Sequence, residues 1–213
     1  MANASRRRER RKPNDFAFLN IPYDDKFSDL YLAYIAGLCG FGLKPRATIE
    51  IPGSERRLDK IYRLIRRCRY SFHDLSRVEI DPSPPPTPRF NMPFNMPFEL
   101  GLAVAHAKNA RGAHQWFVFE TKRNRIKKSL SDVDGTDPHI HGGKPRRVLV
   151  ELSNALVHKR GTPTIDLLFK IYADLQKRAN LLKSDYGGGS LFAARPFKDL
   201  VIAATDLAER NDQ

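Results

Sequence analysis

Glu99 is the first candidate for chemistry in this chain of 213 residues. It follows the tetrapeptide Phe-Asn-Met-Pro, which occurs twice in tandem over residues 90–97, and it precedes the small, apolar stretch LGLAVAHA. A carboxylate is rare in such surroundings unless it is paired or functional. Small neighbours let a ligand approach, so the position suits a carboxylate that acts on a bound molecule through its charge.

The start of the helix around Glu99 can be predicted from the prolines. Asn95 is a good N-cap, and Pro97 is tolerated in the first helical turn. A start at Asn91 would place Pro97 in the helix interior, where it would break a hydrogen bond. Glu99 is therefore predicted in the first turn, where the positive end of the helix dipole favours an ionised carboxylate.

Other polar candidates stand where predicted strands end. In an open α/β sheet, ligands bind beyond the carboxyl ends of the strands. We expect one crevice there, lined by residues around the first strand (Asn20, Tyr23, Asp24), the second (Arg46), the third (Asp74, Ser76, Arg77) and the start of the next helix (Asn95, Glu99).

Short apolar runs alternate with helical patterns from residue 15 to residue 121. The runs 15–22, 43–50, 70–76 and 115–121 are predicted strands, and the segments between them have apolar residues at helical spacing. This order predicts an α/β fold, a flavodoxin-like open parallel sheet of four or five strands with flanking helices. We expect strand 15–22 to be central and strand 43–50, which contains Pro45, to lie at an edge.

The chain divides into three predicted parts. Residues 1–13 form a basic arm, which is expected to be disordered and for which nucleic-acid binding stays open. Residues 14–125 form the α/β nucleotide-binding domain. Residues 126–213 form a loop and a mostly helical C-terminal part that packs on or next to the sheet, with helical patterns at 146–158, 165–183 and 196–209.

Four segments, FLNIPYD, RLIRRCRYSFHDLSR, NMPFELG and DPHIHGG, carry a family resemblance. They resemble an uncharacterised bacterial family related to nucleoside 2-deoxyribosyltransferases and to bacterial Toll/interleukin-receptor-like (TIR-like) NAD hydrolases. The resemblance extends over most of the chain after the basic arm. Its most specific motif is Glu-Leu-Gly at the predicted helix start.

The resemblance implies cleavage or transfer at an N-glycosidic bond of a nucleotide, in prokaryotic defence or stress signalling. Glu99 would be the nucleophile, or would stabilise the oxocarbenium-like sugar, and Asp74 would assist. An arginine, Arg46, Arg77 or Arg89, would hold a phosphate. NAD is the leading substrate and a nucleoside the alternative. The nucleotide is expected as substrate, with no separate cofactor or metal.

Three other interpretations stay open. Glu99 could cap its own helix, and Asp74 could cap the turn after its strand. The crevice could serve a non-enzymatic nucleotide sensor that signals to a partner through the helices. The pair Glu120-x-Lys122 at a strand end is typical of metal-dependent nucleases, and the basic charge of the chain agrees with a nucleic-acid substrate.

The remaining candidates are predicted to be structural. His139 and His141 are half of a metal site at most, because a structural zinc needs about four ligands. Cys39 and Cys68 are expected to be reduced core residues of a cytoplasmic protein. No apolar run has the length of a membrane span, so we expect no membrane partner. Self-association stays open.

Overall fold

The computed structural model describes residues 14–51, 56–77, 95–110, 113–125, 137–159 and 161–211. The basic arm, Arg89 and the first Phe-Asn-Met-Pro copy lie outside the described residues. Five strands form one sheet in the order β2-β1-β3-β4-β5, and every neighbouring pair is parallel. The strands are β1 (Phe16–Asn20), β2 (Lys44–Ala47), β3 (Tyr70–Asp74), β4 (Gln115–Glu120) and β5 (His139–Ile140).

This sheet confirms the predicted α/β class and its flavodoxin-like strand order. β2 lies at an edge, as its proline indicated. The expected position of strand 15–22 needs a correction, because β3 occupies the middle of the sheet and β1 stands next to it. β5 joins the sheet from a segment that was predicted to be a polar loop, so the sheet extends beyond residue 125.

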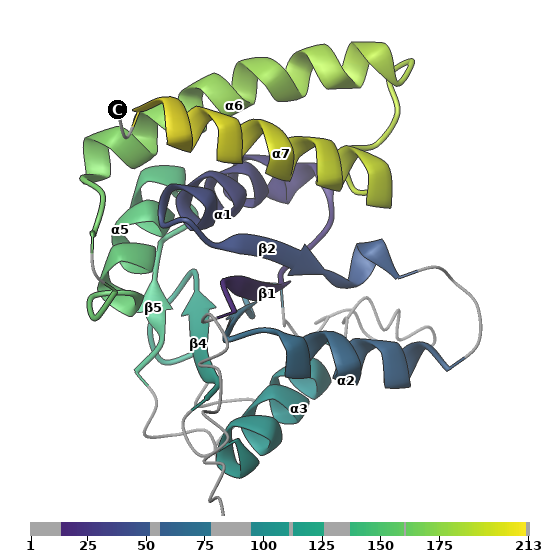
Figure 1. Ribbon diagram of the computed structural model, residues 1–213, viewed down its shortest axis with the longest axis vertical. Coiled ribbons are helices and arrows are strands. Elements are labelled where there is room, and N and C mark those ends of the chain that lie inside the picture. The colour runs from purple at the N-terminus through teal and green to yellow at the C-terminus, as the bar shows by residue number, and fades with distance from the viewer. Residues whose placement is uncertain are drawn as a thin grey trace, which may run out of the picture.

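Helices cover both faces of the sheet (Figure 1). One face packs against α2 (Arg57–Arg67) and α3 (Asn95–Asn109). The other packs against α1 (Ser28–Gly40) and α5 (Pro145–Ala155), and α6 (Ile165–Asp185) and α7 (Ala194–Asn211) form a further layer over α1. Short 3₁₀ turns, η1 (Asp25–Phe27) and η2 (Thr48–Glu50), follow β1 and β2. The three C-terminal helices agree with their predicted ranges within a few residues.

Helix α1 is buried on all sides because it lies between the sheet and the outer helices. Its Tyr34 ring meets Phe119 of β4 edge-on, with the ring centroids 5.4 Å apart. On its other side, Tyr31 packs near Phe197 of α7 at 6.3 Å. A helix with two covered faces must be apolar all round, which is why this sequence shows no clear polar stripe.

Two helical glycines with different surroundings give a paired prediction. A Cβ on Gly37 of α1 would stand 2.5 Å from Leu152 Cδ1 and 3.1 Å from Leu149 Cδ2, both in α5. A Cβ on Gly101 of α3 would meet nothing within 4 Å. Alanine favours either helix by about 1 kcal/mol over glycine, whereas overpacking a core costs about 1–3 kcal/mol.

We therefore expect Gly101→Ala to raise the free energy of unfolding by up to ~1 kcal/mol. Gly37→Ala is expected to lower it by roughly 1–2 kcal/mol, because the overpacking outweighs the gain in helix propensity. Urea unfolding followed by circular dichroism measures both changes. Equal effects at the two positions would contradict the close approach of α1 and α5.

Both cysteines are buried free thiols, as expected. Burial raises the pKa of each thiol to about 12, so neither ionises at neutral pH. Within the ranges that the structure describes, no helix has an apolar stretch long enough for a membrane crossing.

Candidate functional site

The strand order reverses direction between β1 and β3, and such a switch point is where open α/β sheets bind ligands. β1 continues into α1 on one face of the sheet, and α3 covers the other face. The carboxyl ends of β1 and β3 bring Asn20 and His73 together across the pair. This edge of the sheet is therefore the natural place for a site.

Asn20 connects three elements at this edge. Its Nδ2 donates to the backbone oxygen of Met96 in α3 (2.9 Å) and to Nδ1 of His73 in β3 (3.0 Å). Because His73 Nδ1 accepts, the ring proton is assigned to Nε2. Burial, with a smaller effect from His114, lowers the pKa of His73 to about 3, so the ring is neutral. Its buried Nε2 has no partner among the described residues.

Glu99 is the fifth residue of α3, so it lies about one residue beyond the first turn in which it was predicted. Its side chain is buried, with 6 % exposure, and its Oε2 has no hydrogen-bond partner within the described parts of the chain. Burial raises the pKa of Glu99 to about 7, and the charge of Arg57 opposes this only in part. The expectation that the helix dipole dominates is corrected, because desolvation is the larger effect on this carboxyl group.

Tyr23 and Arg57 border the same region. The half-buried Tyr23 donates from its hydroxyl to the Leu19 carbonyl oxygen at 2.9 Å. Burial raises the pKa of Tyr23, and the charges of Tyr31 and Glu99 add to this effect. Arg57 donates to the backbone oxygen of Thr48 at the start of η2 (3.4 Å) and to that of Ile51 just after η2 (3.2 Å), and its charge acts on the Glu99 carboxyl group.

We call this group the switch-point site: Asn20, Tyr23, Arg57, His73 and Glu99. It combines a carboxyl group that titrates near neutrality with a neutral imidazole and one arginine. Glu99 Oε2 and His73 Nε2 are both buried without a protein partner in the described structure. Buried polar atoms are almost always satisfied, so two such atoms indicate that something else meets them.

The raised pKa of Glu99 makes stability depend on pH. In the unfolded chain the group titrates near 4.5, and in the folded protein near 7. The folded state therefore binds the proton more tightly, which favours folding below about pH 4.5 and is progressively lost as the pH rises to about 7. At about 1.4 kcal/mol per pKa unit, the difference is at most ~3 kcal/mol.

Glu99→Gln removes this titration, so we expect the variant to gain stability over wild type as the pH rises from 5 to 8. The gain should be close to zero at pH 4 and about 1–3 kcal/mol at pH 8. Urea unfolding of both proteins at several pH values measures it. A stability difference that stays constant with pH would mean that Glu99 is not desolvated.

Asp74, the predicted assistant of Glu99, faces the other side of the sheet. Side chains alternate along β3, so Asp74 points with Phe72 toward α1, opposite His73. Its Oδ2 accepts from the hydroxyl of Tyr34 at 2.7 Å and lies 3.1 Å from Nε2 of His141. The expectation that Asp74 and Glu99 face one crevice is therefore not met in this structure.

The surroundings of Asp74 form a closed network. Its Oδ1 accepts from the backbone N–H of Ser76 at 2.9 Å, which is the turn-capping geometry considered for it. Ser76 Oγ lies 3.1 Å from His141 Nε2, and Nδ1 of His141 accepts from the Gly143 N–H at 3.0 Å. His141 therefore carries its proton on Nε2. The network joins β3, α1 and the turn after β5.

The other predicted binding residues are engaged locally or exposed. Asp24 caps η1 and pairs with Arg77 at 3.1 Å, with both side chains partly exposed. Arg46 donates to both carboxylate oxygens of Glu50, at 3.0 and 2.9 Å. Asn95 is the exposed first residue of α3. Only Asn20, Tyr23 and Glu99 of the predicted set meet in the switch-point site.

Glu120 of the nuclease-like pair has structural partners, whereas Lys122 is exposed. Glu120 is buried at the end of β4, pairs with Nε of Arg125 at 3.0 Å and accepts from the Thr121 N–H at 2.8 Å. His139 contacts Glu151 at 3.3 Å. No group of three or more His, Cys, Asp or Glu side chains in the described ranges is arranged to hold a metal ion.

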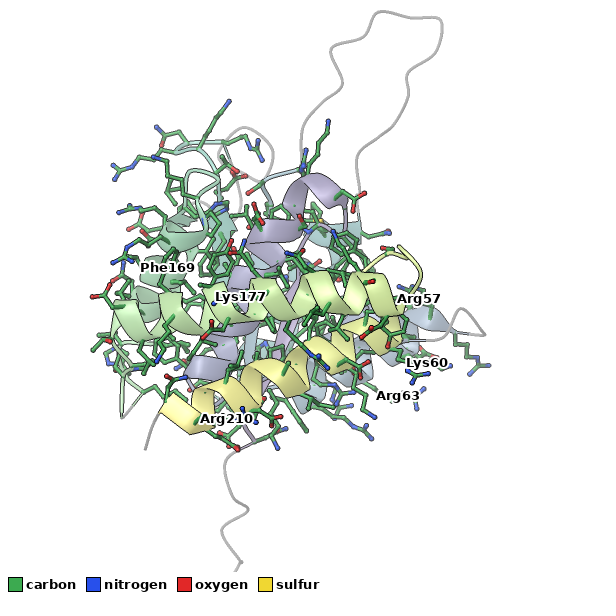
Figure 2. All side chains as sticks on the ribbon, turned by 90° about the horizontal axis from the view of Figure 1, so that it is seen from above. Arg57, Lys60, Arg63, Phe169, Lys177 and Arg210 are labelled. Atoms are coloured by element: carbon green, nitrogen blue, oxygen red, sulfur yellow. The ribbon has the colours of Figure 1, made fainter. Side chains whose placement is uncertain are left out.

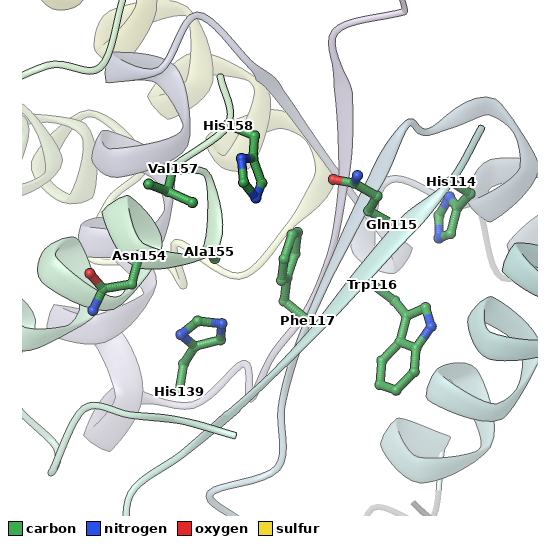
Figure 3. A pocket seen from close by; sticks show the side chains of 9 residues that line it. All are labelled: His114, Gln115, Trp116, Phe117, His139, Asn154, Ala155, Val157 and His158. Carbon is green, nitrogen blue, oxygen red and sulfur yellow. The ribbon is translucent and has the colours of Figure 1, made fainter. Parts of the chain in front are cut away.

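A hollow of about 440 Å³ lies along the part of β4 that β5 leaves unpaired (Figure 3). The Phe117 ring stands between the side chains of His139 and His158, with Asn154 and Val157 on the α5 side. His139 and Phe117 are in edge contact at 6.0 Å. This hollow shares no lining residue with the switch-point site.

Four residues of the switch-point site and of the Asp74 network were not predicted as functional: Tyr34, Arg57, His73 and His141. Tyr34 has the helical spacing of a core residue, and Arg57 is one of many cations in α2. His73 lies inside the predicted strand 70–76 and had no predicted functional role, and His141 was predicted to be structural. The alternation of β3 carried a usable signal, because it places His73 on the face opposite Asp74.

Comparisons with protein-family models, with curated proteins and with solved structures gave no match to this chain. We therefore infer the function from the residues of the site.

Proposed function

We propose that this protein cleaves or transfers the N-glycosidic bond of a nucleotide or nucleoside, with Glu99 as the carboxylate that faces the sugar. One observation carries the proposal: a buried carboxylate oxygen that has no hydrogen-bond partner among the described residues, at the switch point of an open parallel sheet. The resemblance of the Glu-Leu-Gly segment to nucleoside-processing families supports the same assignment.

In the proposed reaction, the bond between the sugar carbon and the base nitrogen breaks, and its electron pair leaves with the base. Positive charge develops on the sugar, and Glu99 stabilises it or forms a bond to the sugar carbon. Water, or the base of an acceptor, then attacks that carbon. A carboxylate in a dry site interacts with this charge more strongly than one in water, which is the benefit of burying Glu99.

His73 and Arg57 supply hydrogen-bond donors to the proposed site. His73 Nε2–H is a buried donor without a protein partner in the described structure, and it suits a hydroxyl or base of the ligand. The guanidinium of Arg57 suits a phosphate. In this proposal Asp74 is a positioning residue, because its carboxylate is occupied by Tyr34, His141 and Ser76. NAD is the leading substrate and a deoxynucleoside the alternative.

We also propose a cellular location and a biological role for the protein. Two buried free thiols agree with a reducing compartment, and we place the protein in the cytoplasm. A role in prokaryotic defence or stress signalling follows from the family resemblance alone.

The deciding experiment incubates purified protein with NAD and with deoxynucleosides and measures released nicotinamide or free base by chromatography. The ionised form of Glu99 is required, so kcat/KM should rise from pH 6 with a midpoint near pH 7 and approach a plateau at about pH 8. Nucleotide binding in calorimetry without any release would instead favour a sensor. Cleavage of DNA or RNA with magnesium, without nucleotide turnover, would favour the nuclease interpretation.

A further inference from the structure

The outward surface of α2 carries a dense row of cations. We call Arg57, Lys60, Arg63, Arg66 and Arg67 the basic stripe; Asp59 is the only acid in this helix. Figure 2 shows Arg57, Lys60 and Arg63 together at one side of the molecule, apart from Lys177 of α6 and Arg210 of α7. The opposite side of α2, with Ile61, Leu64 and Ile65, is buried.

Most of the stripe has no compensating acid among the described residues. No ion pair among the described residues involves Arg57, Arg63, Arg66 or Arg67. Cations on the far side of the molecule do have such partners, as in Arg146–Asp166 and Lys177–Asp174. A helix face with this charge has a positive potential that attracts a polyanion.

One exposed aromatic ring stands among these cations, and a second is exposed on the neighbouring helix α3. Tyr62 lies in the same helix, is 38 % exposed, and has the Arg66 guanidinium 5.8 Å from its ring centre. Phe98 at the start of neighbouring α3 is 53 % exposed. Cations interleaved with rings are what single-stranded nucleic acid requires, since phosphates need charge and bases need a stacking surface.

We propose that this face of α2 and α3 binds single-stranded nucleic acid, with phosphates on the basic stripe and bases on Tyr62 and Phe98. From Arg57 to Arg67 the helix rises about 15 Å, enough for roughly four phosphates. A membrane surface is the other anionic partner. It fits less well, because α2 exposes only Leu58 and Tyr62 as large apolar side chains. Arg57 also belongs to the switch-point site, and the test variants leave it unchanged, so the test is separate from the nucleotide chemistry at Glu99.

The test measures fluorescence anisotropy of labelled single-stranded RNA, single-stranded DNA and duplex DNA with the full chain, from 50 to 300 mM salt. Wild type should bind the single strands more tightly than the duplex. The logarithm of the affinity should fall with the logarithm of the salt concentration with a slope of about −2 to −3. The RNA and DNA arms distinguish the two sources of a single strand.

Matched variants locate the binding surface. Arg63→Gln with Arg67→Gln should weaken binding about tenfold at 100 mM salt and reduce the slope by about 1.4, since two phosphate contacts are lost. Lys177→Gln with Arg210→Gln removes the same charge from the far side and should change the affinity less than twofold. The basic arm is present in every variant, so its contribution is the same throughout.

Tyr62→Ala should weaken binding about five- to one-hundredfold, whereas Tyr62→Phe keeps the ring and should keep the affinity. Melting temperatures check that each variant is folded. Equal losses in the two double variants would overturn the proposal, because net charge alone would then explain binding. Tighter binding to phosphatidylserine vesicles than to oligonucleotides, or no binding to oligonucleotides, would overturn it as well.

Discussion

Glu99→Gln is expected to lower the release of nicotinamide or free base by about 10²- to 10⁴-fold, the scale of losing one key electrostatic or acid–base group. Glutamine keeps the shape of the side chain but cannot supply the negative charge that the developing sugar cation requires. Binding of the nucleotide should change much less than kcat, because the charge acts chiefly in the transition state.

The measurement compares initial rates of wild type and variant at pH 8, where the wild-type carboxylate is ionised. Glu151→Gln is a matched control, since Glu151 is a partly buried helical glutamate on the opposite side of the sheet. The control should keep its activity within about twofold. If Glu99→Gln turns over normally, Glu99 has only a structural role and the proposed function fails.

Asp74→Ala is expected to lower the free energy of unfolding by about 3–5 kcal/mol, the cost of breaking a buried charged network from one side. The side chain is fully buried, and its removal leaves the Tyr34 hydroxyl without its acceptor and the His141 Nε2–H with only Ser76 Oγ. Urea unfolding measures the loss. Asp74→Asn keeps one acceptor oxygen and should cost less.

Asp24→Ala is the matched control for this prediction. Asp24 also caps a short turn and pairs with an arginine, Arg77, but both side chains are partly exposed. Exposed pairs contribute about 0–1 kcal/mol, so this variant should lose little stability. Similar losses at positions 24 and 74 would contradict the structural role of the Asp74 network.

Local patterns in the sequence were sufficient for most of the fold. Apolar runs and helical spacing predicted four strands and the helices, because burial against a sheet imposes those periods on the chain. Pro45 correctly indicated an edge strand. β5 escaped prediction because His139–Ile140 is too short for a period, and its pairing with β4 defines it as a strand.

The candidate site was predictable only in part. The switch point follows from the order of strands and helices, and with it the region of Asn20, Tyr23 and Glu99. The pKa of Glu99 cannot be predicted from the sequence, because burial by neighbouring elements, rather than position in the helix, determines it. The same holds for Arg57, whose distance from Glu99 depends on how α2 and α3 pack.

The separation of Asp74 from Glu99 shows most clearly what only the tertiary structure decides. By itself, the sequence determined that both carboxylates lie near the carboxyl edge of a parallel sheet. The register of β3 decided which face Asp74 meets, because successive side chains of a strand point to opposite faces, and the packing of α3 on the other face decided it for Glu99. Asp74 therefore joins Tyr34 and His141 beneath α1, and Glu99 lies on the other face, where its Oε2 has no hydrogen-bond partner among the residues that the structure describes.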